Sequence, residues 1–208
     1  MMENIKPMDI EKRSFAIITE LLGDTKLEEE NELVIKRVIH TTADFDYADN
    51  LTFSDHAVQK GIAALKSGCD IVTDTQMAKA GINKTILASL GGEVHCFMSD
   101  PGVAQEARSR GVTRAFVSME KAAALEKPCI FAIGNAPTAL LSLEQLMEEG
   151  KAAPALIIGV PVGFVNVEIS KERIIEKARA PYIVARGRKG GSNVAAAICN
   201  ALLYQIRR

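Results

Sequence analysis

Segments with helical apolar periodicity alternate along this 208-residue chain with short runs in which nearly every residue is apolar. Such runs are typical of strands that are buried on both faces, as in a parallel sheet covered by helices. We predict strands at 69–73, 93–98, 115–118, 129–133, 155–159 and 182–186. The alternation predicts one α/β domain spanning residues 1–208, with a mostly parallel central sheet and helices on both faces.

Residue types that favour helix ends mark several of the helices between these strands. Thr25 and Glu28 have the spacing of a capping box, Ser54 is a predicted N-cap, and Asp100 before Pro101 marks another helix start. Together with the apolar periodicity, these signals predict helices over 7–22, 25–40, 54–68, 75–90, 137–149, 170–178 and 192–207, with one more beginning at 101.

The charge balance and the scarcity of aromatic residues argue against nucleic acid as a partner. The chain has 25 Lys and Arg against 26 Asp and Glu, and aromatic residues make up only 5%. It therefore lacks both the positive surface that phosphate binding needs and the rings on which bases stack.

We expect a cytoplasmic protein without a membrane segment. The N-terminal region is rich in charge and has no apolar signal core, and the longest uncharged apolar stretch, 152–167, is short and interrupted by prolines and glycines. The four cysteines stand far apart, without a C-x-x-C pair or a Cys/His cluster. We therefore predict reduced, mostly buried thiols and no metal site.

Ligands of an open parallel sheet bind in the crevice beyond the carboxyl ends of its strands. The most informative loop there follows the last predicted strand and reads Arg-Gly-Arg-Lys-Gly-Gly-Ser over 186–192. Arg186, Arg188 and the helix start at Gly190 and Ser192 would suit a carboxylate or another anion. The alternative is that Ser192 is only an N-cap, surrounded by solvated charges.

Two further loops at this edge are weaker candidates. No phosphate-binding glycine motif is present, so a small molecule rich in carboxylates suits this edge at least as well as a nucleotide. The loop 134–138 offers Asn135 and Thr138 as contacts, although Asn135 is equally a cap for the next helix. The loop 159–163 has no reactive group and is predicted to form a rigid apolar wall, with Phe164 in the core.

His40 is the histidine whose position best suits proton transfer. It lies near the end of a predicted helix, with Asp44 and Asp46 shortly after it. A helix carboxyl end and nearby carboxylates both favour the imidazolium form, which could donate a proton. The alternative is a histidine that only contacts the last carbonyl groups of the helix. His56 and His95 are predicted to be structural or solvent-facing.

Five motifs, in this order along the chain, resemble the precorrin-8X methylmutase family. They are Val-Ile-His-Thr-Thr-Ala-Asp-Phe-Asp-Tyr-Ala at 38–48, Asp-Thr-Gln-Met at 74–77, Gly-Asn-Ala-Pro-Thr-Ala at 134–139, Gly-Val-Pro-Val-Gly-Phe-Val at 159–165 and Gly-Arg-Lys-Gly-Gly-Ser at 187–192. The resemblance extends from Arg-Ser-Phe at 13–15 to the terminal helix. The form Asp-Phe-Asp-Tyr-Ala is most like the cobalt-precorrin-8 enzymes.

The resemblance implies a cofactor-free isomerase that moves a methyl group from C-11 to C-12 of the corrin macrocycle of (cobalt-)precorrin-8, giving cobyrinic acid. It also implies a homodimer with active sites near the subunit interface. His40 falls at the family's catalytic histidine, where it would protonate or hydrogen-bond a ring nitrogen and so assist a 1,5-sigmatropic shift. The acetate and propionate arms of the substrate would be bound by the arginines.

The resemblance also adds three substrate contacts outside these loops. Ser14 and Arg114 match family contacts by motif position, and Asn83 stands where relatives have threonine. Arg114 precedes a predicted strand, so it would lie at the opposite end of the sheet unless it reached the partner subunit's pocket. The full set of predicted substrate contacts is Ser14, Asn83, Arg114, Asn135, Thr138, Arg186, Arg188, Gly190 and Ser192.

Two other functions remain open from the sequence. A non-catalytic tetrapyrrole carrier would hold the same macrocycle without needing His40, and an enzyme acting on a phosphate ligand would use the loop 186–192. Substitution of His40 distinguishes a carrier from a mutase, and calorimetry with nucleotides tests the phosphate enzyme.

Overall fold

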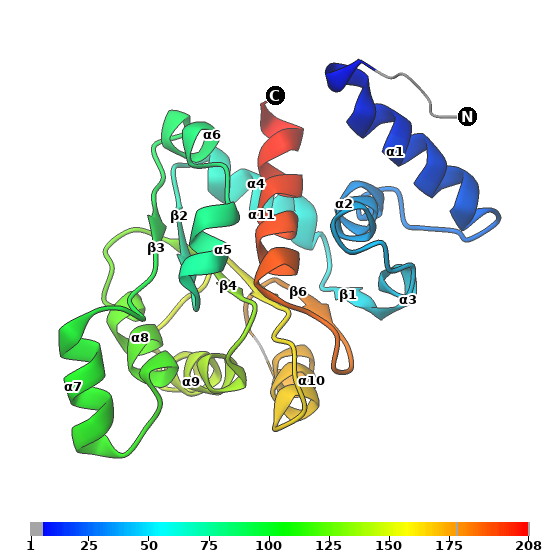
Figure 1. The fold of residues 1–208 in the computed structure, drawn as a ribbon. Helices are drawn as coiled ribbons and strands as arrows, with labels where there is room; N and C mark the ends of the chain where they lie inside the picture. Colours follow the sequence, from blue (N-terminus) through cyan, green and yellow to red (C-terminus); the bar gives the residue numbers. More distant parts are fainter. Residues whose placement is uncertain (1–5, 178, 208) are drawn as a thin grey trace.

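The computed structural model describes residues 6–177 and 179–207, and the strands among them form one six-stranded sheet (Figure 1). These strands are β1 (Leu51–Phe53), β2 (Asp70–Thr73), β3 (Val94–His95), β4 (Cys129–Ile133), β5 (Leu156–Gly159) and β6 (Tyr182–Ala185). Their order across the sheet is β1-β6-β5-β4-β2-β3, and every neighbouring pair is parallel except β1 with β6.

Helices cover both faces of this sheet because alternate strand residues are apolar on each side. The helices are α1 (Pro7–Leu22), α2 (Glu32–Thr42), α3 (Tyr47–Asn50), α4 (Ala57–Lys66), α5 (Gln76–Gly81), α6 (Lys84–Ser89), α7 (Pro101–Arg110), α8 (Arg114–Ala123), α9 (Pro137–Glu148), α10 (Val167–Lys177) and α11 (Ser192–Ile206). In β4, Ile130 and Ala132 pack in the core with α2, α4, α5 and α11, while Phe131 and Ile133 pack with α8, α9 and α10. The predicted α/β domain with a mostly parallel sheet and helices on both faces is confirmed.

The strand predicted at 115–118 is wrong, because these residues belong to α8. Thr113 is the N-cap of this helix, and its Oγ1 accepts the N–H of Phe116 at 3.2 Å. Ala115 and Met119 are buried four residues apart, on one face of the helix. A short apolar run does not distinguish a buried strand from the buried face of a helix.

Two of the predicted helices also have different limits. The helix predicted over 25–40 begins only at Glu32, so the capping box at Thr25 does not form. The helix predicted over 75–90 is interrupted at Ile82, where the backbone is extended, and becomes α5 and α6.

The residues before α4 form a strand that the periodicity does not predict. Ser54, the predicted N-cap, instead accepts the N–H of Tyr182 on its Oγ at 2.9 Å, and α4 begins three residues later. The strand predicted at 93–98 is reduced to β3. Helix α10 begins three residues before the predicted start at 170, and its predicted end, Ala178, lies outside the described residues.

All five parallel strands end at the same edge of the sheet, and the direction of the connections reverses between β2 and β4. This is a topological switch point, where ligands of such sheets bind. Because β1 is antiparallel to β6, with Leu51 opposite Ala185, the segment that leads from α2 into β1 also reaches this edge. We call the loops that follow β2, β4, β5 and β6 here, with the adjoining helix starts, the rim, comprising residues 74–75, 134–138, 160–166 and 186–192.

Candidate functional site

Asp74, directly after β2, organises the switch point. Its buried side chain accepts three backbone N–H groups of the next loop, from Gly134 on Oδ1 at 2.9 Å and from Asn135 and Ala136 on Oδ2 at 2.8 and 2.6 Å. Burial raises the pKa of this carboxyl group, and the three N–H groups oppose the rise. Asp74 is absent from the predicted site residues. An acidic residue directly after a buried strand is the sequence signal that could have identified it.

Glycines let the rim loops pack directly on one another. Gly191 donates its N–H to Val160 O at 2.9 Å, and a Cβ atom on Gly190 would lie 2.1 Å from the same oxygen. A Cβ atom on Gly134 would lie 2.7 Å from Gly191 O. These glycines therefore allow loops to approach each other, where the sequence suggested the approach of a ligand.

Lys189 joins the rim to the segment that leads from α2 to β1. Its Nζ lies 2.6 Å from Asp44 Oδ2 and 2.5 Å from Asp46 Oδ2. These ion pairs raise the pKa of Lys189 and lower that of Asp44. The lysine of the predicted anion-binding loop thus has partners within the chain, and it places the rim beside the end of the helix that carries His40.

The two arginines of the loop 186–192 are largely exposed. Arg188 Nε lies 3.1 Å from Glu168 of α10 and Arg186 Nη2 lies 3.5 Å from Glu172, while the two arginine side chains are 59% and 51% exposed. Exposed ion pairs of this kind contribute little to the stability of a folded protein. Both guanidinium groups can therefore exchange these partners for the carboxylates of a ligand.

The helix caps considered as the alternative roles of Ser192 and Asn135 do not form. The N-cap of α11 is Gly191, and Ser192 lies within the helix with its Oγ 2.8 Å from Thr75 Oγ1. The N-cap of α9 is Ala136, with no capping side chain, and Asn135 is exposed at the rim. The structure therefore gives neither Ser192 nor Asn135 a capping role.

Arg114 lies at the same edge of the sheet as the rim. The hydroxyl oxygens of Thr113, which caps α8, and of Thr138, in the first turn of α9, are 2.8 Å apart. Arg114 follows as the first residue of α8, exposed to solvent, with its Nη1 3.4 Å from Met98 O. No partner subunit is needed to bring Arg114 to this edge, contrary to the expectation from the predicted strand.

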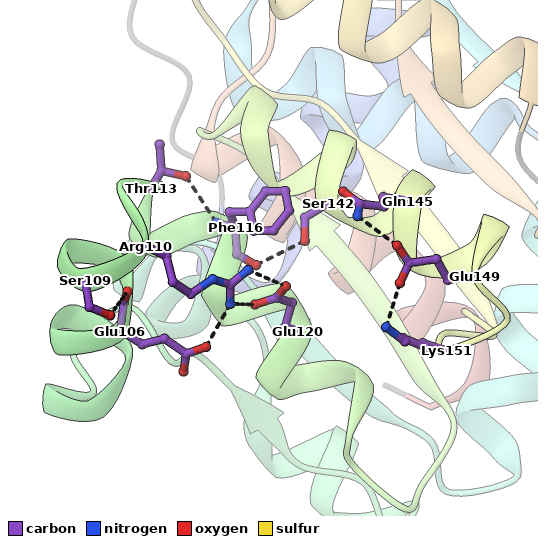
Figure 2. A network of polar contacts seen from close by, with 10 residues as sticks. All are labelled: Glu106, Ser109, Arg110, Thr113, Phe116, Glu120, Ser142, Gln145, Glu149 and Lys151. Carbon is purple, nitrogen blue, oxygen red and sulfur yellow. Dashed lines mark hydrogen bonds and ion pairs between the residues drawn. The ribbon is translucent and has the colours of Figure 1, made fainter.

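Ion pairs brace the corner between α7 and α8. Arg110, at the end of α7, lies 2.8 Å from Glu106 and 2.5 and 2.9 Å from the two carboxylate oxygens of Glu120 (Figure 2). Ser142 of α9 donates to Phe116 O at 3.1 Å. The start of α8, with its exposed arginine, is therefore held by both neighbouring helices.

His40 lies on the exposed side of α2, two residues before this helix ends at Thr42. Its ring centroid is 5.6 Å from that of Phe15 on α1. Partial burial and the charge of Arg37 lower the pKa of His40, and Glu11 opposes this change. The prediction that this setting favours imidazolium is therefore wrong, because burial and the charge of Arg37 outweigh the effect of Glu11.

A groove of about 630 Å³ lies beside His40, between α1, α2 and α11. Its lining includes Phe15, Arg37 and Tyr204, and the Arg37 guanidinium lies 4.9 and 5.1 Å from the centroids of the two rings. Ser14 is half-buried on α1, directly before Phe15. Neither Ser14 nor His40 lines this groove, although both lie close to Phe15, which does.

Asn83 lies far from the rim within this chain. It is the N-cap of α6, where its Oδ1 accepts the N–H of Ile86 at 3.1 Å, and its own N–H donates to Asn200 Oδ1 at 2.8 Å. Asn200 follows Ser192 by eight residues on α11, which places it about 12 Å along the helix axis from the rim. Figure 1 likewise shows α6 at the opposite end of the molecule from α9 and α10.

Large apolar side chains are exposed beside the rim arginines. Phe164, predicted to pack in the core, is 83% exposed, and Val165 and Ile169 are 78% and 61% exposed. The Arg188 guanidinium lies 5.6 Å from the Phe164 ring centroid. The prediction for Phe164 is wrong, and this surface suits a ligand that combines an apolar body with anionic groups.

Within 6–177 and 179–207, no three Asp, Glu, His or Cys side chains are grouped so that they could hold a metal ion. The four cysteines are free thiols, as predicted, and burial raises the pKa of Cys69, Cys129 and Cys199. In the same part of the chain, no helix combines the length and the apolar character needed to cross a membrane.

The fold and the rim together define a parallel α/β protein whose sheet edge suits a bulky, partly apolar anion. Residues 9–205 match the family model described as precorrin-8X methylmutase. The chain is 47% identical over 208 residues to the cobalt-precorrin-8 methylmutase of Salmonella typhimurium, with 97% of each chain covered. It is 46% identical over 198 residues to the cobalt-precorrin-8 methylmutase of Priestia megaterium, covering 95% of this chain and 88% of the relative.

A crystal structure of a precorrin-8X methylmutase from Thermus thermophilus has the same fold. It matches with a TM-score of 0.85 and 38% sequence identity, over 94% of this chain and 96% of the other. The chain therefore belongs to the precorrin-8X methylmutase family, as the five motifs predict.

Proposed function

We propose that this protein is the isomerase that moves a methyl group from C-11 to C-12 of (cobalt-)precorrin-8, giving cobyrinic acid. The relatives from Salmonella and Priestia support this reaction, because both are named cobalt-precorrin-8 methylmutases. One structural observation carries the proposal. The ion pairs of Lys189 with Asp44 and Asp46 set the loop that bears the rim arginines beside the end of the helix that bears His40.

The exposed guanidinium groups bind the acetate and propionate arms of the substrate in this proposal. Arg186, Arg188 and Arg114 are all exposed at one edge of the sheet, and a guanidinium matches a carboxylate with two parallel N–H bonds. The exposed apolar side chains beside Arg188 receive the macrocycle. Further contacts are Asn135, Thr138, Gly190 and Ser192 at the rim and Ser14 on α1, whereas Asn83 is left out because it caps α6.

His40 lends a proton or a hydrogen bond to a ring nitrogen near the migrating methyl group. Withdrawing electron density from the π-system lowers the barrier to a 1,5-sigmatropic shift, and a positioned proton donor contributes about 10² to 10⁴ in rate. The pKa of His40 is lowered in the chain alone. Carboxylates of a bound substrate raise it again, since a nearby opposite charge favours the charged form. Binding of the substrate thus favours the protonated form of the donor.

His40→Asn tests this function. We expect kcat with cobalt-precorrin-8, followed by absorption spectroscopy, to fall by about 10² to 10⁴. The Kd for cobyrinic acid should change less than about threefold, because the arginines are intact. His56→Asn is the matched control, since His56 is exposed and has a φ of 54°, which asparagine adopts readily.

The outcomes separate the alternatives. A non-catalytic carrier would bind cobyrinic acid but show no turnover even without a substitution. Turnover by the unsubstituted protein that survives in the His40→Asn variant would refute the assigned role of His40.

We also propose that the protein works as a homodimer with its active sites near the interface. The exposed side chains of Phe164, Val165 and Ile169 support this, because large apolar side chains gathered on a surface mark contacts with a ligand or another chain. Sedimentation equilibrium should give twice the mass of one chain, and the mass of a single chain would contradict the proposal.

The cytoplasm is the compartment we propose for this reaction, with the whole chain, 1–208, acting as one domain. The free thiols support a reducing compartment, since disulfides are rare there. Fractionation of the cells that make the protein tests the assignment.

A further inference from the structure

Lys171, on α10, is a fully buried lysine beneath the rim. Its side chain has no exposed surface, and its Nζ donates to two backbone carbonyl oxygens, Gly187 O and Lys189 O, each at 2.8 Å. Lysine is almost never fully buried unless its charge is paired. Burial lowers the pKa of Lys171 to about 8.

The ammonium group of Lys171 is directed at the turn around Arg188 and not at a carboxylate. Among the described residues, no carboxylate forms an ion pair with it. Glu168 and Glu172, on the same helix, pair instead with the two rim arginines. The partners of this buried charge are therefore two carbonyl groups of the loop that binds carboxylates in the proposed function.

We propose that Lys171 is a positioning residue, which holds the turn 187–189 in the conformation that presents Arg188 to a carboxylate of the substrate. The inference rests on the proposed function for the carboxylate. Three consecutive carbonyl groups of the turn are occupied, because Gly163 N donates to Arg188 O at 3.2 Å between the two bonds from Lys171. Carbonyl oxygens bound to an ammonium group inside the protein no longer face an incoming anion.

Other contacts on the turn are the bond from Gly163 N to Arg188 O and the ion pairs of Lys189 with Asp44 and Asp46, but none of these involves the carbonyl groups that Lys171 binds. Gly187 has a φ of 72°, a region that glycine enters without steric cost and that leaves the unbound loop many alternatives. The side-chain pair of Arg188 with Glu168 is exposed and weak. Bonds from an ionised donor are about twice as strong as neutral ones, so a buried ammonium with two acceptors restricts the turn strongly.

Lys171→Met, which removes the charge and the donors at similar length, is the central test. Lys177→Met is the matched control, because Lys177 lies on the same helix with a half-exposed side chain that pairs with Glu144 at 3.3 Å. We expect trypsin to cleave the folded Lys171→Met protein after residues 186, 188 and 189 about tenfold faster than the control. Mass spectrometry of the released C-terminal peptide measures this rate without any substrate.

Turnover with cobalt-precorrin-8 provides the second measurement. KM should rise about tenfold in Lys171→Met while kcat changes less than about threefold, because the loss is in binding of a carboxylate arm and not in proton donation. Lys171→Arg, which keeps the charge and several donors, should restore both KM and resistance to trypsin. Equal cleavage and equal KM in Lys171→Met and Lys177→Met would overturn the inference.

The turnover and trypsin measurements distinguish failure of the inference from failure of the proposed function. If the unsubstituted protein does not convert the substrate, the function fails, and the trypsin result still reports whether Lys171 holds the turn. If conversion occurs and the variant behaves like its control, only the positioning role fails.

The unsubstituted protein offers a test that needs no substitution. Amide hydrogen exchange of Gly163, whose N–H donates to Arg188 O, and of Gly191, whose N–H donates to Val160 O, corrected for its intrinsic pH dependence, should lose protection between pH 7 and 9.5, as Lys171 loses its proton and its two bonds weaken. Protection that stays constant across this pH range would overturn the inference. Because this test uses the unsubstituted protein, it can be carried out even if the Lys171→Met variant does not fold.

No other group near Lys171 accounts for a change in this pH range. The charged and titratable groups on the elements packed against it are Glu168, Glu172, Arg173, Glu176 and Lys177 on α10, Glu144 and Glu148 on α9, Tyr182 on β6, and Arg186, Arg188 and Lys189 in the loop. Carboxyl and guanidinium groups keep their charge between pH 7 and 9.5, and ordinary lysine and tyrosine side chains titrate above it.

Discussion

Gly190→Ala tests whether the rim loops form one packed unit. A Cβ atom at this position would lie 2.1 Å from Val160 O and 3.0 Å from Pro161 O, and the φ of 157° is one that only glycine adopts readily. Carbon and oxygen atoms in contact stay about 3.3 Å apart. The two loops must therefore separate by about 1 Å, which also stretches the bond from Gly191 N to Val160 O, 2.9 Å long in the structure.

The free energy of unfolding should fall by about 3 to 7 kcal/mol. Overpacking costs about 1 to 3 kcal/mol, the strained backbone about 1 to 3 kcal/mol, and the weakened hydrogen bond about 1 kcal/mol. For a chain of this length 1 kcal/mol corresponds to about 2 to 4 °C, so the Tm should fall by about 15 °C. Urea denaturation and thermal melting, both followed by circular dichroism, measure these changes.

Gly150→Ala separates the steric part of this cost from the backbone part. Gly150 has a φ of 69°, and a Cβ atom there would have no neighbour within 4 Å. This variant should therefore lose only about 1 kcal/mol. If the two variants lost the same stability, contact between the loops would not be the reason for glycine at position 190, and the account of the rim as one packed unit would be refuted.

Two further predictions concern the buried acid of the switch point and the pH dependence of turnover. Asp74→Ala leaves the buried N–H of Gly134 and the partly buried N–H groups of Asn135 and Ala136 without their acceptor, at about 1 to 3 kcal/mol for a buried group and less for the others. Removal of a buried charge offsets part of this cost. We therefore expect a loss of about 3 kcal/mol in urea denaturation, whereas an unchanged stability would contradict this role of Asp74. Glu11 raises the pKa of His40, and the proposed donor is the protonated imidazole, so kcat/KM falls as pH rises through that pKa. In Glu11→Gln this fall should occur at lower pH, and a fall at the same or a higher pH would count against His40 as the donor.

The sheet was predictable where strands are long enough to be buried on both faces. The run Cys129–Ile133 was predicted to its end residues, because five consecutive apolar residues between turn signals leave few alternatives. The run at 115–118 failed because its apolar residues form one side of a helix that Thr113 caps. β1 has only three residues, and it is a strand because β6 lies beside it and not because of its own pattern.

The site was predictable as a set of loops but not as a set of contacts. The loops 134–138 and 186–192 follow predicted strands, so their meeting at one edge followed from the topology. The partners of their polar groups are far away in sequence. Asp74 binds a loop 60 residues later, and Lys189 binds Asp44, 145 residues earlier. Such pairings are decided by tertiary structure, and no local pattern indicates them.

The three cations of the loop 186–192 show why a motif alone does not define a binding site. Lys189 is held by two carboxylates near α2, and the turn around Arg188 is held from below by Lys171, which lies outside the motif. Only the guanidinium groups stay exposed with weak partners. Substitution of any of these residues should reduce activity, but the reason differs between the lysines and the arginine. Loss of Lys189 or Lys171 alters the shape of the loop and is measurable without substrate, whereas loss of Arg188 alters binding while the loop keeps its shape.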